Sequence, residues 1–417
     1  MKHSRRRVVI TGLGVVSPIG IGKEAFWQSL VAGKSGVDYV AAFDPSPYPC
    51  QIAAEVKDFR PSDFMSPRKA KVMARFSQFA VAATRLALED ADLRVSPDLS
   101  RQVAICYGTS VGGGGDIAAE ALDSLHKEGV EGINPWAALE YPPHAAASYV
   151  AIEFGIRGAA VSVSSNCCTG VDTIHAGFCE ISSGNARAAL VGASDAPIFP
   201  LSFGAFCALG ALSKRNNAPE QASRPYDALR DGIVIGEGAA TLVLEDLEFA
   251  QDRGAPVYAE VLGHGAASEA INMRKGDLSG KAMAGAITRA IRNGQLLPSE
   301  IDHVNAHGSS LPDYDICDSN AFKEAFGPHA YRIPICSIKS MLGQPVSAAG
   351  TMQTAAACLS IKYQQVPPTI NQEVPDPNCD LDYVSNLSRT ARLRHVVING
   401  HSFGGSVAAL VIGKVSA

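Results

Sequence analysis

The sequence contains no uninterrupted apolar run of about 18 residues, so we expect no transmembrane helix. It also contains no excess of basic residues, since 36 Lys and Arg stand against 41 Asp and Glu and leave a formal net charge of −5. This balance gives no reason to expect binding to nucleic acid or to an acidic membrane surface. The basic N-terminal residues lead into a β-rich run and not into the apolar segment of a signal peptide, so no signal peptide is expected.

The ten cysteines include no C-x-x-C pair and show no regular spacing. In a chain of 417 residues, such scattered cysteines favour free thiols in a reducing cytosol over a disulfide framework. We therefore expect a cytoplasmic protein, and no residue pattern suggests a metal site.

Strand-like and helix-like segments alternate along the chain, which predicts an α/β fold. The alternation restarts after a charged segment that ends near residue 254, so we predict an internally duplicated fold with halves at residues 1–254 and 255–417. Expected strands are residues 7–11, 103–107, 188–191, 240–244, 257–262, 303–305, 336–338, 396–399 and 408–412, and expected helices are residues 69–89, 281–293 and 347–362.

The most informative segment is residues 161–172. We expect its β-rich strand to end in two adjacent cysteines, Cys167 and Cys168, and a helical stretch to follow at residues 171–181. Unpaired N–H groups and the helix dipole favour a thiolate at a helix N-terminus, and the same N–H groups can bind an oxyanion. We therefore expect a nucleophilic thiol of lowered pKa that forms a thioester. The alternative is a pair of cysteines that packs as small apolar side chains.

Three later motifs place polar side chains at strand ends. His307 follows the expected strand 303–305, Lys339 and Gln344 precede a helix of small residues, and residues 399–406 form a Gly-rich turn between two strands. Each has a structural alternative, because such a histidine can be a core residue, such a lysine a solvated cap and such a turn a simple hairpin. Their order along the chain is more specific than any one of them.

Together with the opening residues 6–18 and the segments 222–232, 236–238 and 366–371, these motifs resemble the β-ketoacyl-ACP synthase family, and most closely its elongating, KAS II-like branch. The resemblance covers essentially the whole chain. It implies a thiolase fold, which is a duplicated α/β fold of five layers, α-β-α-β-α. It also implies an obligate dimer and catalysis of decarboxylative Claisen condensation.

The resemblance assigns the site residues one by one. Cys167 falls on the nucleophile, and Cys168 on the next position, with the register anchored at Gly170. His307 falls on the first catalytic histidine, and Lys339 on the lysine that organises it.

Further assignments concern the residues around this centre. Phe403 falls on the gating phenylalanine, whose backbone N–H joins that of Cys167 in the oxyanion hole. Asp315 and Asp318 fall on two acidic positions that follow the histidine. No cofactor is expected, because the acyl groups arrive on the phosphopantetheine of an acyl carrier protein.

Gln344 stands where this branch of the family has its second histidine. Its amide can donate a hydrogen bond to an enolate but cannot relay a proton. We therefore expect Gln344 to act as a neutral donor, and we expect the pH dependence of activity to come from Cys167 and His307 only.

Other departures cluster at the mouth of the site. Leu311 replaces a hydroxyl residue that helps to bind the pantetheine arm, whereas Ser309 remains, and His401 replaces an aromatic residue in the gating loop. With Gly404 and Gly405 these residues form the expected substrate-binding set.

Two further departures accompany them. Val407 replaces an asparagine, and Gly210 replaces a basic residue that helps to dock the carrier protein. The remaining candidates for docking are Arg68, Lys69, Lys71, Lys214 and Arg215.

These departures favour a specialised synthase of a type II fatty-acid or polyketide-like pathway, acting as a homodimer or as a heterodimer with a second ketosynthase-like subunit. A second hypothesis is a chain-length-factor-like partner subunit, although such subunits usually lose the nucleophile that Cys167 provides. A degradative thiolase is disfavoured, because that family has a second cysteine in the turn that holds Phe403 here. Acyl transfer without condensation needs only the cysteine and the histidine, and this possibility stays open.

Overall fold

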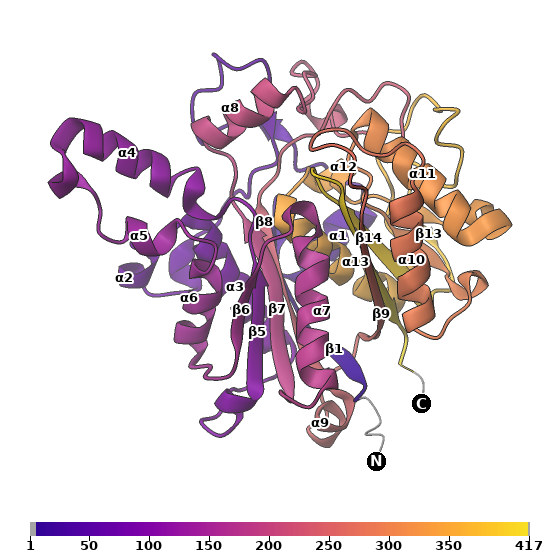
Figure 1. The fold of residues 1–417 in the computed structure, drawn as a ribbon, viewed down its shortest axis with the longest axis horizontal. Coiled ribbons are helices and arrows are strands. Elements are labelled where there is room, and N and C mark those ends of the chain that lie inside the picture. Colours follow the sequence, from indigo (N-terminus) through magenta and orange to yellow (C-terminus); the bar gives the residue numbers. More distant parts are fainter. Residues whose placement is uncertain (1–5, 416–417) are drawn as a thin grey trace.

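The computed structural model describes residues 6–415 and contains one large mixed sheet (Figure 1). The first half of the chain contributes β1 (Val8–Ser17), β5 (Val103–Gly108), β6 (Ala160–Val163), β7 (Ala188–Asp195) and β8 (Gly238–Asp246). The second half contributes β9 (Ala259–Ser268), β10 (His303–Asn305), β11 (Ile335–Cys336), β14 (His395–His401) and β15 (Ser406–Gly413). The short strands are β2 (Gly20–Ile21), β3 (Asp38–Tyr39), β4 (Ile52–Ala53), β12 (Gln365–Val366) and β13 (Arg389–Thr390).

The order of these strands repeats between the two halves. The sheet runs β11-β10-β14-β15-β9-β1-β8-β7-β5-β6, so from its centre outward each half places its first, fifth, fourth, second and third strand in that order. The directions repeat as well, because the second strand is parallel to the third and fourth, and the fifth is antiparallel to its two neighbours. The fold is therefore duplicated, as predicted, while the boundary at residues 254 and 255 stays a prediction.

Helices complete five layers. The helices α7 (Thr169–Ser182) and α13 (Ala349–Tyr363) contact each other and strands of both halves, so they form the middle layer. The helix α3 (Arg75–Asp90) covers β1 and β8 on the other face of the first half, and α10 (Lys281–Asn293) covers β9 and β15 in the same way. This arrangement confirms the predicted order α-β-α-β-α.

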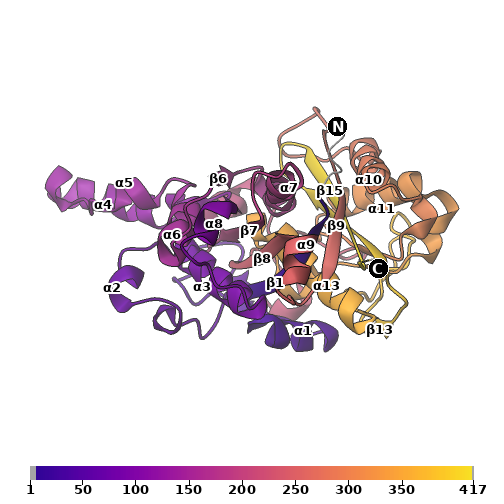
Figure 2. The same ribbon diagram turned by 90° about the horizontal axis from the view of Figure 1, so that it is seen from below.

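The remaining helices surround this core. They are α1 (Lys23–Val31), α2 (Pro67–Ala70), α4 (Ile117–Glu128), α5 (Ala137–Glu140), α6 (Ala145–Phe154), α8 (Pro200–Leu209), α9 (Leu247–Asp252), α11 (Pro312–Phe326) and α12 (Lys339–Leu342). The helices α4 and α5 project from one end of the molecule (Figure 2). No helix within residues 6–415 combines the length and the apolar character needed to cross a membrane.

The two middle helices meet through glycine at their first turns. A Cβ atom on Gly170 would lie 2.6 Å from the backbone N of Thr351, and one on Gly350 would lie 2.6 Å from the backbone N of Val171. Only glycine allows backbones to approach this closely. The crossing therefore brings together the two 3₁₀ turns that precede these helices, Asn166–Cys168 and Val346–Ala348.

Two sequence-based predictions of local structure were wrong. The helix expected over residues 69–89 is interrupted after α2, because Ala74 is extended and its N–H donates to a carboxylate oxygen of Glu140 at 2.8 Å. The strand expected to reach Cys167 ends at Val163. There the backbone N–H of Ser165 donates to the hydroxyl of Thr169 at 2.8 Å, which starts the turn early.

Candidate active site

The turn before α7 holds the predicted nucleophile. Asn166 adopts a left-handed conformation with φ of 55°, and Cys167 follows it with only 5 % of its surface exposed. The amide Nε2 of Gln344 lies 3.5 Å from Cys167 Sγ, and Oδ1 of Asn166 lies 3.6 Å from the same sulfur. The structure thus places Gln344, from the second half, directly at the thiol of the first half.

The prediction of a lowered pKa for Cys167 was wrong. Burial raises the pKa of this thiol to about 12, and the nearby charge of Lys339 offsets only part of that effect. Desolvation outweighs the helix N-terminus because the residue lies in the turn before the helix, under a cover of apolar side chains. The thiol is therefore protonated at neutral pH until it reacts.

Cys168 has a different environment from its neighbour. Its Sγ donates to the carbonyl of Ser406 at 3.2 Å, and its backbone N–H donates to the hydroxyl of Ser402 at 3.0 Å. That hydroxyl in turn donates to the carbonyl of Ser165 at 2.8 Å. These bonds join the nucleophile turn to the Gly-rich turn, and sequence reasoning missed Ser402 because its partners are distant in the chain.

His307 is buried and lies two residues after the end of β10, just past the strand as predicted. Its Nδ1 accepts the backbone N–H of His401 at 3.2 Å, which assigns the ring proton to Nε2. Burial, followed by the positive charge of Lys339, lowers the pKa of His307 well below its ordinary value. The ring is therefore a neutral hydrogen-bond donor at physiological pH.

Lys339 contacts the loop that carries this histidine. Its Nζ donates to the carbonyl of His307 at 2.6 Å and lies 3.4 Å from the amide oxygen of Gln353. Burial lowers the pKa of Lys339 to about 8. Gln353 also donates to the carbonyls of Asn305 and Ala306 at 3.0 and 2.9 Å, so it fixes the same loop. Its only signal in the sequence is a polar side chain within the apolar helix α13.

Two aspartates of α11 hold the backbone of this loop. Asp318 accepts the N–H of Gly308 at 2.8 Å and an amide hydrogen of Asn399 at 2.9 Å. Asp315 accepts the N–H of Ser309 at 2.8 Å, and burial raises the pKa of this carboxyl to about 6. Both aspartates therefore act on the position of the loop after His307.

The backbone of Gln344 is anchored against the first half. Its N–H donates to the carbonyl of Val234 at 2.7 Å, and its carbonyl accepts the N–H of Gly236 at 2.9 Å. The side-chain oxygen of Gln344 is buried and accepts no hydrogen bond from the described residues. The amide is thus held by its backbone, with its NH₂ group toward Cys167.

The Gly-rich turn between β14 and β15 holds the predicted gate. The Phe403 ring is half-buried and meets the Tyr314 ring edge-on, with centroids 5.5 Å apart. Among residues 6–415, the backbone N–H of Phe403 donates to no acceptor. By contrast, the N–H of Gly404 donates to the carbonyl of Met273 and that of Gly405 to the carbonyl of Ser402, so both glycines brace the turn.

The other residues of the expected substrate-binding set lie in different surroundings. Leu311 packs, half-buried, on the apolar cluster that contains Cys167 and Val346. Ser309 is buried, and its hydroxyl accepts the N–H of Leu311 at 3.3 Å. His401 lies behind His307, with its side chain fully buried. Their roles in binding substrate stay predictions.

The predicted docking residues differ in what holds them. Arg68 and Lys69 in α2, Lys71 directly after it and Lys214 are all exposed. Lys69 already forms an ion pair with Glu153 at 2.6 Å, and the guanidinium of Arg215 donates to a backbone carbonyl. Arg68, Lys71 and Lys214, which form no ion pair with the described residues, are therefore the stronger candidates, and the docking surface stays a prediction.

Comparison with known proteins identifies the family. Residues 5–250 match the family described as Beta-ketoacyl synthase, N-terminal domain, and residues 258–373 match Beta-ketoacyl synthase, C-terminal domain. The chain is 40% identical over 414 residues to 3-oxoacyl-[acyl-carrier-protein] synthase 2 of Coxiella burnetii, with 99% of each chain covered.

Solved structures agree with the sequence matches. The ishigamide ketosynthase/chain length factor is 35% identical, with a TM-score of 0.92, and the match covers 99% of this chain and 100% of that one. A type II PKS acyl-carrier protein in complex with its ketosynthase bound to the hexaketide is also 35% identical, with a TM-score of 0.90 and the same coverage. With both domains matched and the duplicated five-layer topology in place, the chain belongs to the β-ketoacyl synthase family and has the thiolase fold.

Proposed function

We propose that this protein is a β-ketoacyl-acyl-carrier-protein synthase of a specialised type II fatty-acid or polyketide-like pathway. It joins an acyl group held on Cys167 to malonyl-ACP by decarboxylative Claisen condensation. The observation that carries this proposal is the buried Cys167 thiol beside the amide of Gln344, with His307 fixed as a neutral Nε2–H donor on the adjoining loop.

In the first step the sulfur of Cys167 attacks the acyl thioester of the carrier protein. The new bond between Cys167 and the acyl carbon forms, the carrier's sulfur–carbon bond breaks, and the carrier thiol leaves with the proton that Cys167 loses. The backbone N–H groups of Cys167 and Phe403 donate to the oxyanion, since neither is used in another backbone hydrogen bond of the described residues.

In the second step malonyl-ACP releases CO₂, and the electron pair of the broken bond forms an enolate. The enolate oxygen accepts hydrogen bonds from Nε2 of His307 and from the amide of Gln344, two donors that need no change of protonation state. The enolate carbon then attacks the acyl carbonyl, and the bond to Cys167 breaks. The charge of Lys339 favours the departing thiolate, which regains a proton from solvent.

The acyl groups arrive on the phosphopantetheine of an acyl carrier protein, and no other cofactor is needed for these steps. The carrier docks on the exposed cations Arg68, Lys71 and Lys214. The strand β6 ends the sheet, and its Val161 is 47% exposed, so its free edge suits pairing with a second subunit. The active form is therefore a homodimer or a heterodimer with a second ketosynthase-like chain. Its place of action is the cytoplasm.

A chain-length-factor-like partner subunit is the second candidate. The replacement of the second histidine by Gln344 is the observation that favours it. The nucleophile Cys167, set among preorganised donors, favours the enzyme.

The test combines acylation and condensation. The purified protein, alone and with any co-purified partner, is incubated with acyl-ACP, and the acylated peptide is identified by mass spectrometry before malonyl-ACP is added. We expect acylation on Cys167 followed by release of CO₂ and formation of β-ketoacyl-ACP. Cys167→Ala abolishes both steps, whereas the matched Cys168→Ala retains acylation.

Three outcomes would contradict this proposal in different ways. Adduct on Cys168 would refute the assignment of the nucleophile. Acylation without condensation in either setting would leave only acyl transfer. Condensation that needs a partner and survives Cys167→Ala would identify the chain as the partner subunit.

A further inference from the structure

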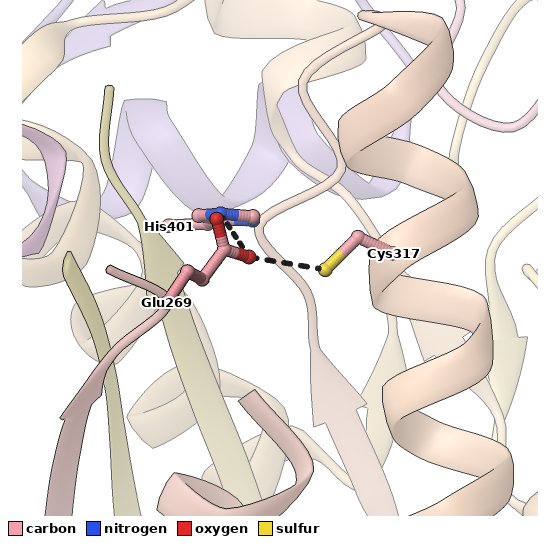
Figure 3. A group of neighbouring side chains, drawn as sticks. All are labelled: Glu269, Cys317 and His401. Atoms are coloured by element: carbon pink, nitrogen blue, oxygen red, sulfur yellow. Dashed lines mark hydrogen bonds and ion pairs between the residues drawn. The ribbon is translucent and has the colours of Figure 1, made fainter. Parts of the chain in front are cut away.

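A second group of reactive side chains lies behind the catalytic histidine. Glu269 follows β9, Cys317 lies on α11 and His401 ends β14, yet one ligand atom of each lies within 4.8 Å of the others (Figure 3). Cys317 and His401 are buried, and the side chain of Glu269 is only 1 % exposed. None of the three is used in the reaction steps above.

Two contacts join the members of this group, and several of its polar atoms have no further partner among the described residues. Nε2 of His401 lies 3.0 Å from Oε1 of Glu269, and Cys317 Sγ lies 3.8 Å from the same oxygen. Neither ring nitrogen of His401 nor Oε2 of Glu269 has a hydrogen-bond partner within residues 6–415, although Nε2 lies within ion-pair distance of Oε1. Buried polar atoms are normally paired, so an imidazole and a carboxylate with unpaired atoms in one buried group suggest a missing partner.

The charges around the group point to a cation. Glu269 forms no ion pair with a lysine or arginine within residues 6–415. Two more carboxylates, Asp277 and Asp318, interact electrostatically with His401. Burying a carboxylate without a neighbouring cation costs free energy, and buried carboxylates in proteins are therefore paired with a cation or bound to a metal ion.

We propose that Glu269, Cys317 and His401 form a binding site for a divalent transition-metal ion of the Zn²⁺ class. Zinc binds sulfur, imidazole nitrogen and carboxylate oxygen at about 2.0–2.3 Å, so tetrahedral donors around one ion lie roughly 3–4 Å apart. The 3.0 and 3.8 Å contacts match that spacing. A thiol and an imidazole argue against Mg²⁺ or Ca²⁺, which prefer oxygen ligands alone.

This site reaches the catalytic centre through His401. The backbone N–H of His401 binds Nδ1 of His307, and Phe403 follows two residues later in the same turn. An ion that fixes the His401 ring restrains the start of the Gly-rich turn. The sequence predicted no metal site here, because the three ligands are far apart in the chain and come together only in the fold.

The test measures metal binding and not activity. Metal-free protein carrying Cys167→Ala, which removes the catalytic thiol as a competing ligand, is titrated with Zn²⁺ against a chromophoric chelator. We expect one tight equivalent per chain and, with Co²⁺ in its place, a near-ultraviolet thiolate-to-metal charge-transfer band. In the same background Cys317→Ser, Glu269→Gln and His401→Phe each weaken Zn²⁺ affinity by roughly tenfold or more. The matched control Cys207→Ser removes a thiol outside the group and leaves affinity unchanged.

Two controls test whether the variants fold. His401→Phe introduces the aromatic residue expected at this position from the family resemblance, and thermal unfolding is measured for every variant. If a ligand variant unfolds, two measurements on the Cys167→Ala protein with all three ligands intact still test the site. They are the Co²⁺ spectrum and the alkylation of Cys317, which bound Zn²⁺ should slow. Zinc affinity that is the same in all three ligand variants would overturn the proposal. So would the absence of a stoichiometric site, or a Co²⁺ complex without a thiolate band.

Discussion

The two halves of the molecule share one topology but use it for different chemistry. In each half a 3₁₀ turn with a left-handed residue, Asn166 (φ 55°) or Val346 (φ 45°), leads into a helix of the middle layer. In the first half the next residue is the reactive Cys167. In the second half it is Ser347, whose N–H donates to the buried carboxylate of Asp195 at 2.9 Å. One turn therefore presents a nucleophile, and its counterpart is tied into the core.

The loops after the second strand of each half also differ, but here the second half carries the reactive side chain. After β5, Thr109 donates to Asp195 at 2.6 Å and helps to bind that carboxylate. After β10, the corresponding loop carries His307, and a lysine and two aspartates hold its backbone. The duplicated fold thus supplies the thiol from one half and the donors from the other, and the predictions below test this division.

The largest effect is expected from the histidine loop. His307→Ala removes a fixed donor to the enolate, so condensation should fall by about 10²–10³-fold while acylation of Cys167 persists. The matched variant Thr109→Ala, in the loop of the other half, should change condensation little. Malonyl-ACP decarboxylation is the measurement. A wild-type rate in His307→Ala would refute the donor role, and an equal loss in Thr109→Ala would refute the division between the halves.

The next effect concerns the amide donor. Gln344→Ala should cost about 2–4 kcal/mol of transition-state stabilisation, whereas Gln344→His should retain activity or increase it, since it restores a ring donor. Ser347→Ala is the control, because it keeps the backbone N–H that binds Asp195. The kcat for condensation, with the chain alone and with a partner, gives the result. Unchanged activity of Gln344→Ala in both settings would favour the partner-subunit hypothesis.

The pH profile should be governed by Lys339, which corrects the expectation that Cys167 and His307 govern it. Burial raises the pKa of Cys167 to about 12 and moves that of His307 well below 6.5, so neither titrates near neutral pH. Lys339 has a pKa of about 8, so its charge is present below that pH and activity should fall as pH rises through it. In Lys339→Met this fall in activity above about pH 8 should disappear, and kcat measured against pH tests the expectation.

The same shift predicts a change in stability. The folded protein loses the Lys339 proton near pH 8, whereas the unfolded chain keeps it up to a pKa of 10.5. The unfolded state therefore binds more protons between these values, and this group makes stability rise with pH across that window. Denaturant unfolding of the unsubstituted protein and of Lys339→Met at pH 7.5 and 10 compares the two slopes, and equal slopes would contradict the lowered pKa.

The smallest effect concerns the helix crossing. Gly170→Ala and Gly350→Ala each place a methyl group 2.6 Å from a backbone nitrogen, so each should destabilise the fold by about 1–3 kcal/mol. Gly285→Ala in α10 meets no atom within 4 Å and should instead stabilise it by about 0.4–1 kcal/mol. Chemical denaturation measures all three. The free energy of unfolding should fall in the two crossing variants and rise in Gly285→Ala. Equal changes in all three would mean that the crossing does not depend on close backbone contact.

Local patterns predicted much of the fold. The bounds of α10 and β10 and the hairpin of β14 and β15 agree with the sequence, because helical spacing, β-branched runs and a Gly-rich turn are local signals. The break before α3 and the early end of β6 could not be predicted in this way. They depend on hydrogen bonds from Ala74 to Glu140 and from Ser165 to Thr169.

The site shows the same limit. Cys167, Gln344 and Lys339 lie where the motifs indicated, but the pKa of the thiol follows from its burial, which a helix N-terminus argument leaves out. Ser402, although it lies in the Gly-rich motif, and Gln353 act through partners far away in the sequence, so their roles could not be predicted.

The glycine crossing of α7 and α13 has a consequence for altering which acyl chains the protein accepts. Because Gly170 and Gly350 meet backbone to backbone, with the Val171 side chain packed on Gly350, this contact limits how closely the nucleophile turn approaches the turn beside Gln344. Leu311 packs near the thiol but lies outside this glycine contact, so we expect that a larger or smaller apolar residue in its place changes the pocket while the contact between the two helices stays. Pocket size and catalytic geometry are thus separable targets for engineering.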